Sequence, residues 1–235
     1  MLKTKFIPLI FVLILFSCEE ITLLNFTETN MLYEDNATIE LNIPKAEGTS
    51  ISAKAINKVV ENYIANMLVF LEEPSDTLQL DYAINAFDLE YKSFKDGFGE
   101  NAMVWDASFD GEVTYQSPSL ISIAINSYVN SGGAHGNLNI TFFNFDSTGT
   151  LLKFNDLFTD KEGLTEVVKA YFEEETKGSE INYFFGEPFH LPVNIGFNDE
   201  GVVFFYNVYE IASYSDGITE FTVPFDAIEN HLNIY

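Results

Sequence analysis

The sequence has no arginine, and its 11 basic residues are outnumbered by 36 aspartates and glutamates. The resulting formal charge of −25 repels the phosphates of nucleic acids and attracts cationic partners. The chain also has a single cysteine, which excludes a disulfide within it. We therefore expect no nucleic-acid partner and a fold held together by its core alone.

The hydrophobic run Phe6–Phe16 is too short to cross a bilayer as a helix and has the length of a signal-peptide core. It ends at Leu15-Phe16-Ser17-Cys18, which resembles a bacterial lipobox, although an ordinary secretory signal is the alternative. We expect residues 1–17 to be a signal peptide and Cys18 to carry lipid. Cleavage would remove two lysines and leave 9 against 36 acids, a charge of −27. The protein would then be anchored in the cell envelope, on the periplasmic or surface side of the outer membrane.

Apolar residues form 47% of the chain and aromatic residues 15%, which is typical of a sizeable core and not of disorder. Residues 18–36 are polar and are expected to form a tether. Beyond them helical and strand patterns are grouped, which predicts an α+β fold with mostly antiparallel sheets, a few packed helices and two small subdomains. Strands are expected over residues 37–43, 102–109, 112–116, 120–129, 138–145, 193–197, 202–208 and 218–223. Helices are expected over 50–71, 77–95, around 164–172 and over 224–232. The buried face of the first helix is expected to contain Ile51, Ala55, Val59, Tyr63, Met67 and Leu71, which are spaced by four.

The segment Gly132-Gly133-Ala134-His135-Gly136 lies between two of the expected strands. It predicts a loop in which Gly132 and Gly133 supply backbone angles that cost other residues energy. The His135 ring then has two alternative roles. It bonds a loop carbonyl and fixes the turn, or it faces a carboxylate and takes part in binding.

The motifs of common catalytic sites are missing. The three histidines lie far apart in the sequence, and none has a second histidine or a cysteine nearby, as a zinc site would need. No Gly-Lys-Ser/Thr follows the glycines, no G-x-S-x-G elbow occurs, and no aspartate turn has the calcium-loop pattern. We expect no catalytic residues, no metal and no cofactor, and a binding module in preference to an enzyme.

The second half of the chain carries a family resemblance. Gly132-Gly133-Ala134-His135, Phe145-Asp146 and Asp156-Leu157-Phe158 are similar to segments of an envelope domain pair of unknown function. That pair occurs outside the catalytic domain of the peptidoglycan deacetylase PdaC and in the extracellular part of the lysozyme-sensing anti-sigma factor RsiV. The ending Phe197–Gly201, Val203–Tyr206, Tyr209-Glu210-Ile211-Ala212, Tyr214 and Gly217 also resembles this family.

The resemblance implies a PdaC-like domain over residues 37–147 and an RsiV-like domain over residues 148–235. It implies a non-catalytic envelope module that binds or senses a muramidase-like cationic protein or peptidoglycan. A structural or assembly lipoprotein is the main alternative, and an enzyme acting on envelope glycans, with His135 as base, is a weaker one. The expected ligand-binding residues are Gly132, Gly133, His135, Asn137, Tyr206, Tyr209, Glu210 and Tyr214. The three tyrosines could stack on sugars or simply pack in the core.

Overall fold

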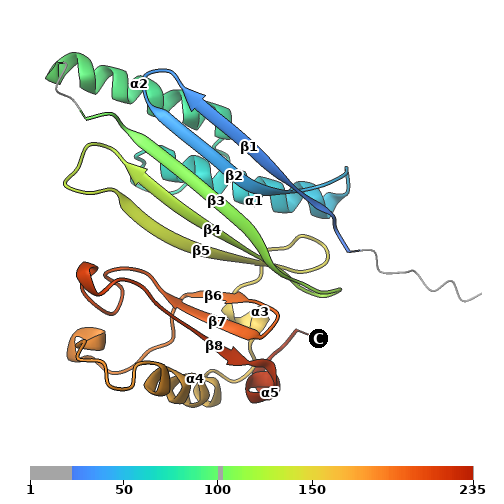
Figure 1. The fold of residues 1–235 in the computed structure, drawn as a ribbon. Coiled ribbons are helices and arrows are strands. Elements are labelled where there is room, and N and C mark those ends of the chain that lie inside the picture. The colour runs from blue at the N-terminus through green and yellow to red at the C-terminus, as the bar shows by residue number, and fades with distance from the viewer. Residues whose placement is uncertain (1–22, 100–102, 235) are drawn as a thin grey trace, which may run out of the picture.

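The fold is α+β, with two sheets, each covered by helices on one side (Figure 1). It is taken from a computed structural model that describes residues 23–99 and 103–234, so the expected signal peptide and Cys18 lie outside the described residues. The larger sheet has five strands in the order β1-β2-β3-β4-β5. Its strands are β1 (Phe26–Glu34), β2 (Thr38–Ala46), β3 (Asp106–Gln116), β4 (Ile121–Asn130) and β5 (Asn137–Phe145).

Strands β2 and β3 are the one parallel pair of this sheet, and the other neighbours are antiparallel. The connection between β2 and β3 contains both long helices, α1 (Ile51–Leu68) and α2 (Leu80–Phe98), because a parallel pair needs a crossover. The helices cover one face of the sheet (Figure 1) and close the first hydrophobic core over it.

Helix α1 begins where the sequence predicts, since the Ser50 side chain accepts a hydrogen bond from the Ala53 amide at 3.1 Å. Its expected buried face is correct in part: Val59, Tyr63 and Met67 pack against the core, but Ile51 is 87% exposed and the expected end, Leu71, lies beyond the helix. A spacing of four residues drifts around a helix of 3.6 residues per turn. The buried face corrects this drift with steps of three, from Ala53 to Ile56 and from Ala65 to Leu68, while Val60 and Ile64 follow steps of four.

The second unit has the three-stranded antiparallel sheet β6-β7-β8 and a second core. Its long helix packs beside β8 (Figure 1), and the hairpin predicted between β6 and β7 is confirmed. The elements are α3 (Phe154–Leu157), α4 (Lys161–Glu175), β6 (Asn194–Phe197), β7 (Gly201–Tyr206), β8 (Thr219–Pro224) and α5 (Phe225–Ile228), with short 3-10 turns at Tyr183–Gly186, Tyr214–Asp216 and Glu229–His231.

Two sequence expectations are corrected by the larger sheet. The expected tether, residues 18–36, is wrong over Phe26–Glu34, which form the edge strand β1. One side of this strand faces solvent, so its composition stays polar and hides the strand pattern.

The strands expected over 102–109 and 112–116 are one strand, β3, that runs through Gly111. A Cβ on Gly111 would come within 2.9 Å of the Pro44 ring. The glycine is therefore needed because Pro44 packs closely against the β3 backbone, and it does not mark a turn.

The edge strand β5 meets the second unit through side-chain amides. The Asn194 side chain donates to the Ile140 carbonyl at 2.7 Å and accepts from the Phe142 amide at 2.8 Å. Asn207 likewise accepts from the Ile140 amide at 2.8 Å and donates to its carbonyl at 3.0 Å. We call Asn194 and Asn207 the asparagine clamp, because they pair with the outward backbone groups of β5 as a neighbouring strand would.

None of the helices in the described part of the chain is long and apolar enough to span a bilayer.

Candidate functional site

The loop that contains His135 has the predicted position. Strands β4 and β5 pair antiparallel, with Val129 opposite Asn137, and residues 131–136 connect them. Gly132 has φ +82°, and a Cβ there would lie 3.0 Å from the Trp105 indole nitrogen. Gly133 does not have a positive φ, so that expectation is wrong. The structure instead requires a glycine at position 136, because a Cβ on Gly136 would collide with the Tyr128 ring.

His135 is exposed and stacks on an aromatic ring of the second unit. Its Nδ1 lies 2.9 Å from the Gly136 carbonyl oxygen, which fits the first of its two predicted roles. The ring also lies 4.6 Å from the Tyr214 ring, centroid to centroid, at an interplanar angle of 26°. Tyr214 in turn lies 5.4 Å from Tyr209. We call His135, Tyr214 and Tyr209 the aromatic ladder; it joins loops of the two units at the surface.

The backbone around Tyr209 holds its ring out into solvent. Tyr209 has φ +67°, an uncommon value for a residue other than glycine, and is 60% exposed. The next residue, Glu210, accepts a hydrogen bond from the Asn207 amide at 2.9 Å and so closes this turn. Burial raises the pKa of Glu210, although this hydrogen bond and nearby His190 act in the opposite direction. Because Asn207 belongs to the asparagine clamp, the turn is fixed to β5.

The remaining expected ligand residues are not part of the ladder. Tyr206 is fully buried, and its hydroxyl donates to the His190 carbonyl at 2.6 Å. Burial, followed by the negative charge of Glu210, raises the pKa of Tyr206 far above its usual range. Tyr206 is therefore a core residue, which is the second of the two roles that the sequence left open for the tyrosines. Asn137 is exposed at the start of β5.

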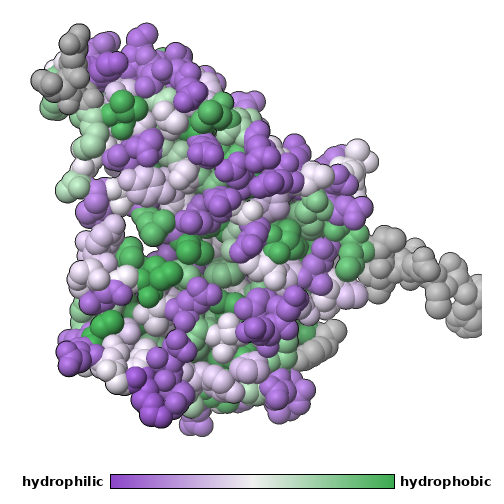
Figure 2. Space-filling model, in the orientation of Figure 1, coloured by the Kyte–Doolittle hydropathy of each residue, from purple (hydrophilic) through white to green (hydrophobic). Residues whose placement is uncertain are grey.

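The structure adds a cleft between the two sheets that the sequence did not reveal. It has a volume of about 710 Å³, and four of its lining residues are acidic: Glu28, Asp110, Glu112 and Glu220. Apolar side chains also line it, among them those of Ile140, Phe142, Val203 and Phe205. On the face shown in Figure 2, hydrophobic residues gather beside the hollow between the two parts and hydrophilic ones surround them. We call the cleft that is lined by these acidic and apolar residues the acidic cleft.

The negative charge of the acidic cleft is not balanced by basic side chains in its lining. No lysine or histidine lines it, and the ion pairs found among residues 23–99 and 103–234 involve other carboxylates. Burial of part of its carboxyl raises the pKa of Glu220, although the residue as a whole is exposed. A cation entering the cleft would therefore meet several unpaired carboxylates.

One pattern in the sequence predicts part of this cleft. Asp110 and Glu112 are two residues apart, so in one continuous strand both point to the same face of the sheet. The expected strands 102–109 and 112–116 ended on either side of Gly111, so Asp110 and Glu112 were not expected to share a strand. Glu28 lay in the expected tether, and its approach to Glu220 depends on how the two sheets pack, which no local pattern contains.

The described residues contain no group of three or more His, Cys, Asp or Glu side chains that could hold a metal. His135 also lacks a carboxylate within ion-pairing distance in the described part of the chain. The geometry thus offers stacking surfaces and carboxylates, which suit binding.

Comparisons with known proteins confirm the resemblance drawn from the sequence. Residues 32–138 match the family model described as deacetylase PdaC, and residues 155–226 match that of a protein family of unknown function, DUF3298. Two crystal structures share the fold. A DUF3298 family member from Bacteroides fragilis has a TM-score of 0.65 at 18% identity, over 89% of this chain and 93% of that one. A DUF3298 family protein from Pseudomonas aeruginosa has a TM-score of 0.62, with the same identity and coverage. No curated protein matches the chain.

Proposed function

We propose that the protein is a non-catalytic binding module of the bacterial cell envelope, held there by lipid on Cys18, and that it binds a muramidase-like cationic protein. The observation that carries this proposal is the acidic cleft, because it combines unpaired carboxylates with an apolar lining between two sheets. The formal charge of −25 supports it, since a cationic protein would be steered toward the whole molecule.

The chemistry of the cleft suits lysine and arginine side chains. Such a side chain would place its aliphatic stem against the half-buried Ile140 and Phe142 and its charged head among Asp110, Glu112 and Glu220. The carboxylates come from both sheets, so a bound side chain would bridge the two units. The four carboxylates are exposed, so each pair would contribute at most about 1 kcal/mol, and their number in one cleft supplies the affinity.

The aromatic ladder supports a second candidate ligand, a cell-wall glycan. His135 stacks on Tyr214, the Tyr209 ring lies tilted beside Tyr214, and all three are exposed. Exposed rings offer apolar area with polar tips, which suits the faces of sugar rings. The ladder and the acidic cleft are distinct sets of residues, so the two ligands can be tested separately.

For the protein ligand, the test is the affinity for a lysozyme-type muramidase of the variant Glu112→Gln with Glu220→Gln. We expect its Kd to rise about tenfold, because two surface ion pairs of up to about 1 kcal/mol each are lost. The matched control is Glu72→Gln with Glu73→Gln, which removes the same charge from an exposed loop between α1 and α2. Equal losses in both variants would show that only net charge matters and would contradict binding in the cleft.

For the glycan, the test is binding of a soluble peptidoglycan fragment to Tyr214→Ala, the central ring of the ladder. We expect a several-fold loss, since stacking on one ring is worth about 1 kcal/mol. Tyr82→Ala is the control, because Tyr82 is 63% exposed on α2 and outside the ladder. Unchanged binding by Tyr214→Ala would remove the ladder as a glycan site.

A further inference from the structure

Strand β1 is an edge of the five-stranded sheet with unused backbone groups. In an antiparallel pair, alternate residues direct their N–H and C=O groups toward the partner strand. The Asn25 carbonyl accepts from the Glu47 amide at 2.8 Å, which places the odd-numbered residues of β1 toward β2. The backbone groups of Glu28, Asn30 and Leu32 therefore point outward, where the order of the sheet places no further strand.

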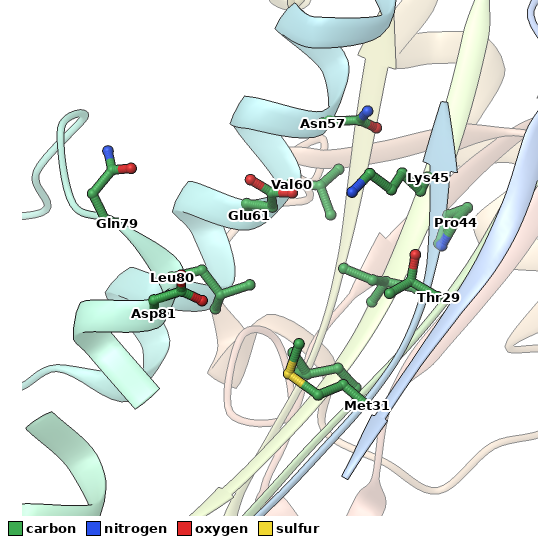
Figure 3. A pocket seen from close by; sticks show the side chains of 12 residues that line it. Thr29, Met31, Pro44, Lys45, Asn57, Val60, Glu61, Gln79, Leu80 and Asp81 are labelled. Carbon is green, nitrogen blue, oxygen red and sulfur yellow. The ribbon is translucent and has the colours of Figure 1, made fainter. Parts of the chain in front are cut away.

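A groove of about 280 Å³ lies beside this edge, between β1, β2 and the two long helices. Figure 3 shows Thr29 and Met31 on one side of it and Leu80 and Asp81 of α2 on the other. The lining is apolar at Met31, Leu80 and the β2 residues Leu41 and Ile43. A strand added to β1 would point every second side chain toward the helix side of the sheet, where this groove lies.

We propose that β1 pairs with an extended, basic segment of another polypeptide, which adds a sixth strand to the sheet. In this mode the main-chain bonds supply affinity, and pockets for alternate side chains supply selectivity. Strand β1 has neither proline nor lysine, the residues that commonly block such an edge. The edge is thus open to a strand in a way that the opposite edge, closed by the asparagine clamp, is not.

Charge determines which kind of segment fits. Glu28 and Glu34 lie on β1, while Glu61 and Asp81 line the groove and Lys45 is its one basic residue. A second copy of the chain is disfavoured, because antiparallel pairing centred on Met31 would set Glu28 of one copy opposite Glu34 of the other. Two chains of charge −25 would also repel each other. A segment in which lysines alternate with apolar residues meets both the carboxylates and the groove.

The test uses a capped synthetic peptide of alternating lysine and valine, with a glutamate–valine peptide as its control. The key variant is Asn30→Pro, which removes an outward N–H and leaves the bonds between β1 and β2 in place. Its matched control is Asn30→Ala, which keeps the N–H. We expect Asn30→Pro to weaken binding of the lysine peptide at least about tenfold, Asn30→Ala to change it less than about twofold, and the glutamate peptide not to bind.

Amide hydrogen exchange supplies a second readout, because bound peptide should slow exchange at Glu28, Asn30 and Leu32 more than at Thr29 and Met31. Equal affinities of the two Asn30 variants, or binding without this alternating protection, would overturn the proposal. A dimer of the wild-type chain that Asn30→Pro dissociates would also overturn it, in favour of a second copy. The two proposed surfaces share Glu28, whereas Glu220 lines the acidic cleft and is not on the β1 edge, so Glu220→Gln should leave peptide binding unchanged.

Discussion

The two edge strands of the five-stranded sheet, β5 and β1, differ in whether their outward backbone groups have hydrogen-bond partners. At β5, the asparagine clamp takes up the outward groups of Ile140 and Phe142 and fixes the second unit against the sheet. At β1, the outward groups are left to solvent, and only the turn that leads into β2 is fixed. One edge is thus used for internal assembly, whereas the other has no neighbouring strand among residues 23–99 and 103–234.

The fixed point at the open edge is Asp88 of α2, a carboxylate only 3% exposed. It accepts hydrogen bonds from the Asn36 amide at 2.7 Å, the Asn36 side chain at 2.7 Å and the Ala37 amide at 2.8 Å. The first unit thus fastens its edge strand with one buried charge, and the second unit docks with neutral amides. Charge-assisted bonds are the stronger kind, so loss of Asp88 should destabilise the protein more than loss of an asparagine of the clamp.

The largest effect is expected for Asp88→Ala. It leaves the amides of Asn36 and Ala37 without their acceptor, and we expect a loss of about 3 kcal/mol in the free energy of unfolding. Urea unfolding measures it, with Glu90→Ala, an exposed acid two residues along the same helix, as control. A loss no larger than that of the control would show that the β1–β2 turn does not depend on this carboxylate.

A smaller loss is expected for Asn207→Ala, about 1–2 kcal/mol, because the Ile140 amide and carbonyl lose a partner and the turn at Tyr209 loses its attachment to β5. Hydrogen exchange at Ile140 should accelerate, while exchange at Asn30 on the open edge stays unchanged. Asn155→Ala, at an exposed position on α3, is the control. Unchanged exchange at Ile140 would mean that the asparagine clamp does not close the edge.

The smallest effects concern pH, and the two buried carboxylates should respond with opposite sign. Burial raises the pKa of Asp88, but its three hydrogen bonds outweigh burial and lower it below the ordinary 3.8. Its contribution to stability is therefore complete above that value and is lost as the pH falls through the lowered pKa. Burial raises the pKa of Glu210 above 4.5, so its carboxylate costs stability as the pH rises through the raised value.

Urea unfolding between about pH 2 and pH 7 tests this pair of signs. Asp88→Asn should flatten the loss of stability at acid pH, whereas Glu210→Gln should flatten the decline above pH 4.5. The same pH slope in both variants would contradict the assignment of the two carboxylates.

The features that could be predicted from the sequence are those that depend on local residue patterns. The helix start at Ser50, the β4–β5 pairing around His135 and the β6–β7 hairpin follow from capping, alternation and turn residues. The edge strand β1 could not be predicted, because a strand with one solvent-facing side and a free edge keeps a polar composition. The stacking of His135 on Tyr214 was also hidden, since it depends on how one unit docks on the other.

The salt dependence of binding tests the central proposal, a cationic protein in the acidic cleft, most directly. The Kd for a lysozyme-type muramidase would be measured from about 50 mM to about 500 mM salt, a range over which screening shortens from about 14 Å to about 4 Å. We predict that wild-type affinity falls steeply and that Glu112→Gln with Glu220→Gln shows a flatter fall than Glu72→Gln with Glu73→Gln. Affinity independent of salt, or identical slopes in the two double variants, would contradict binding through the cleft.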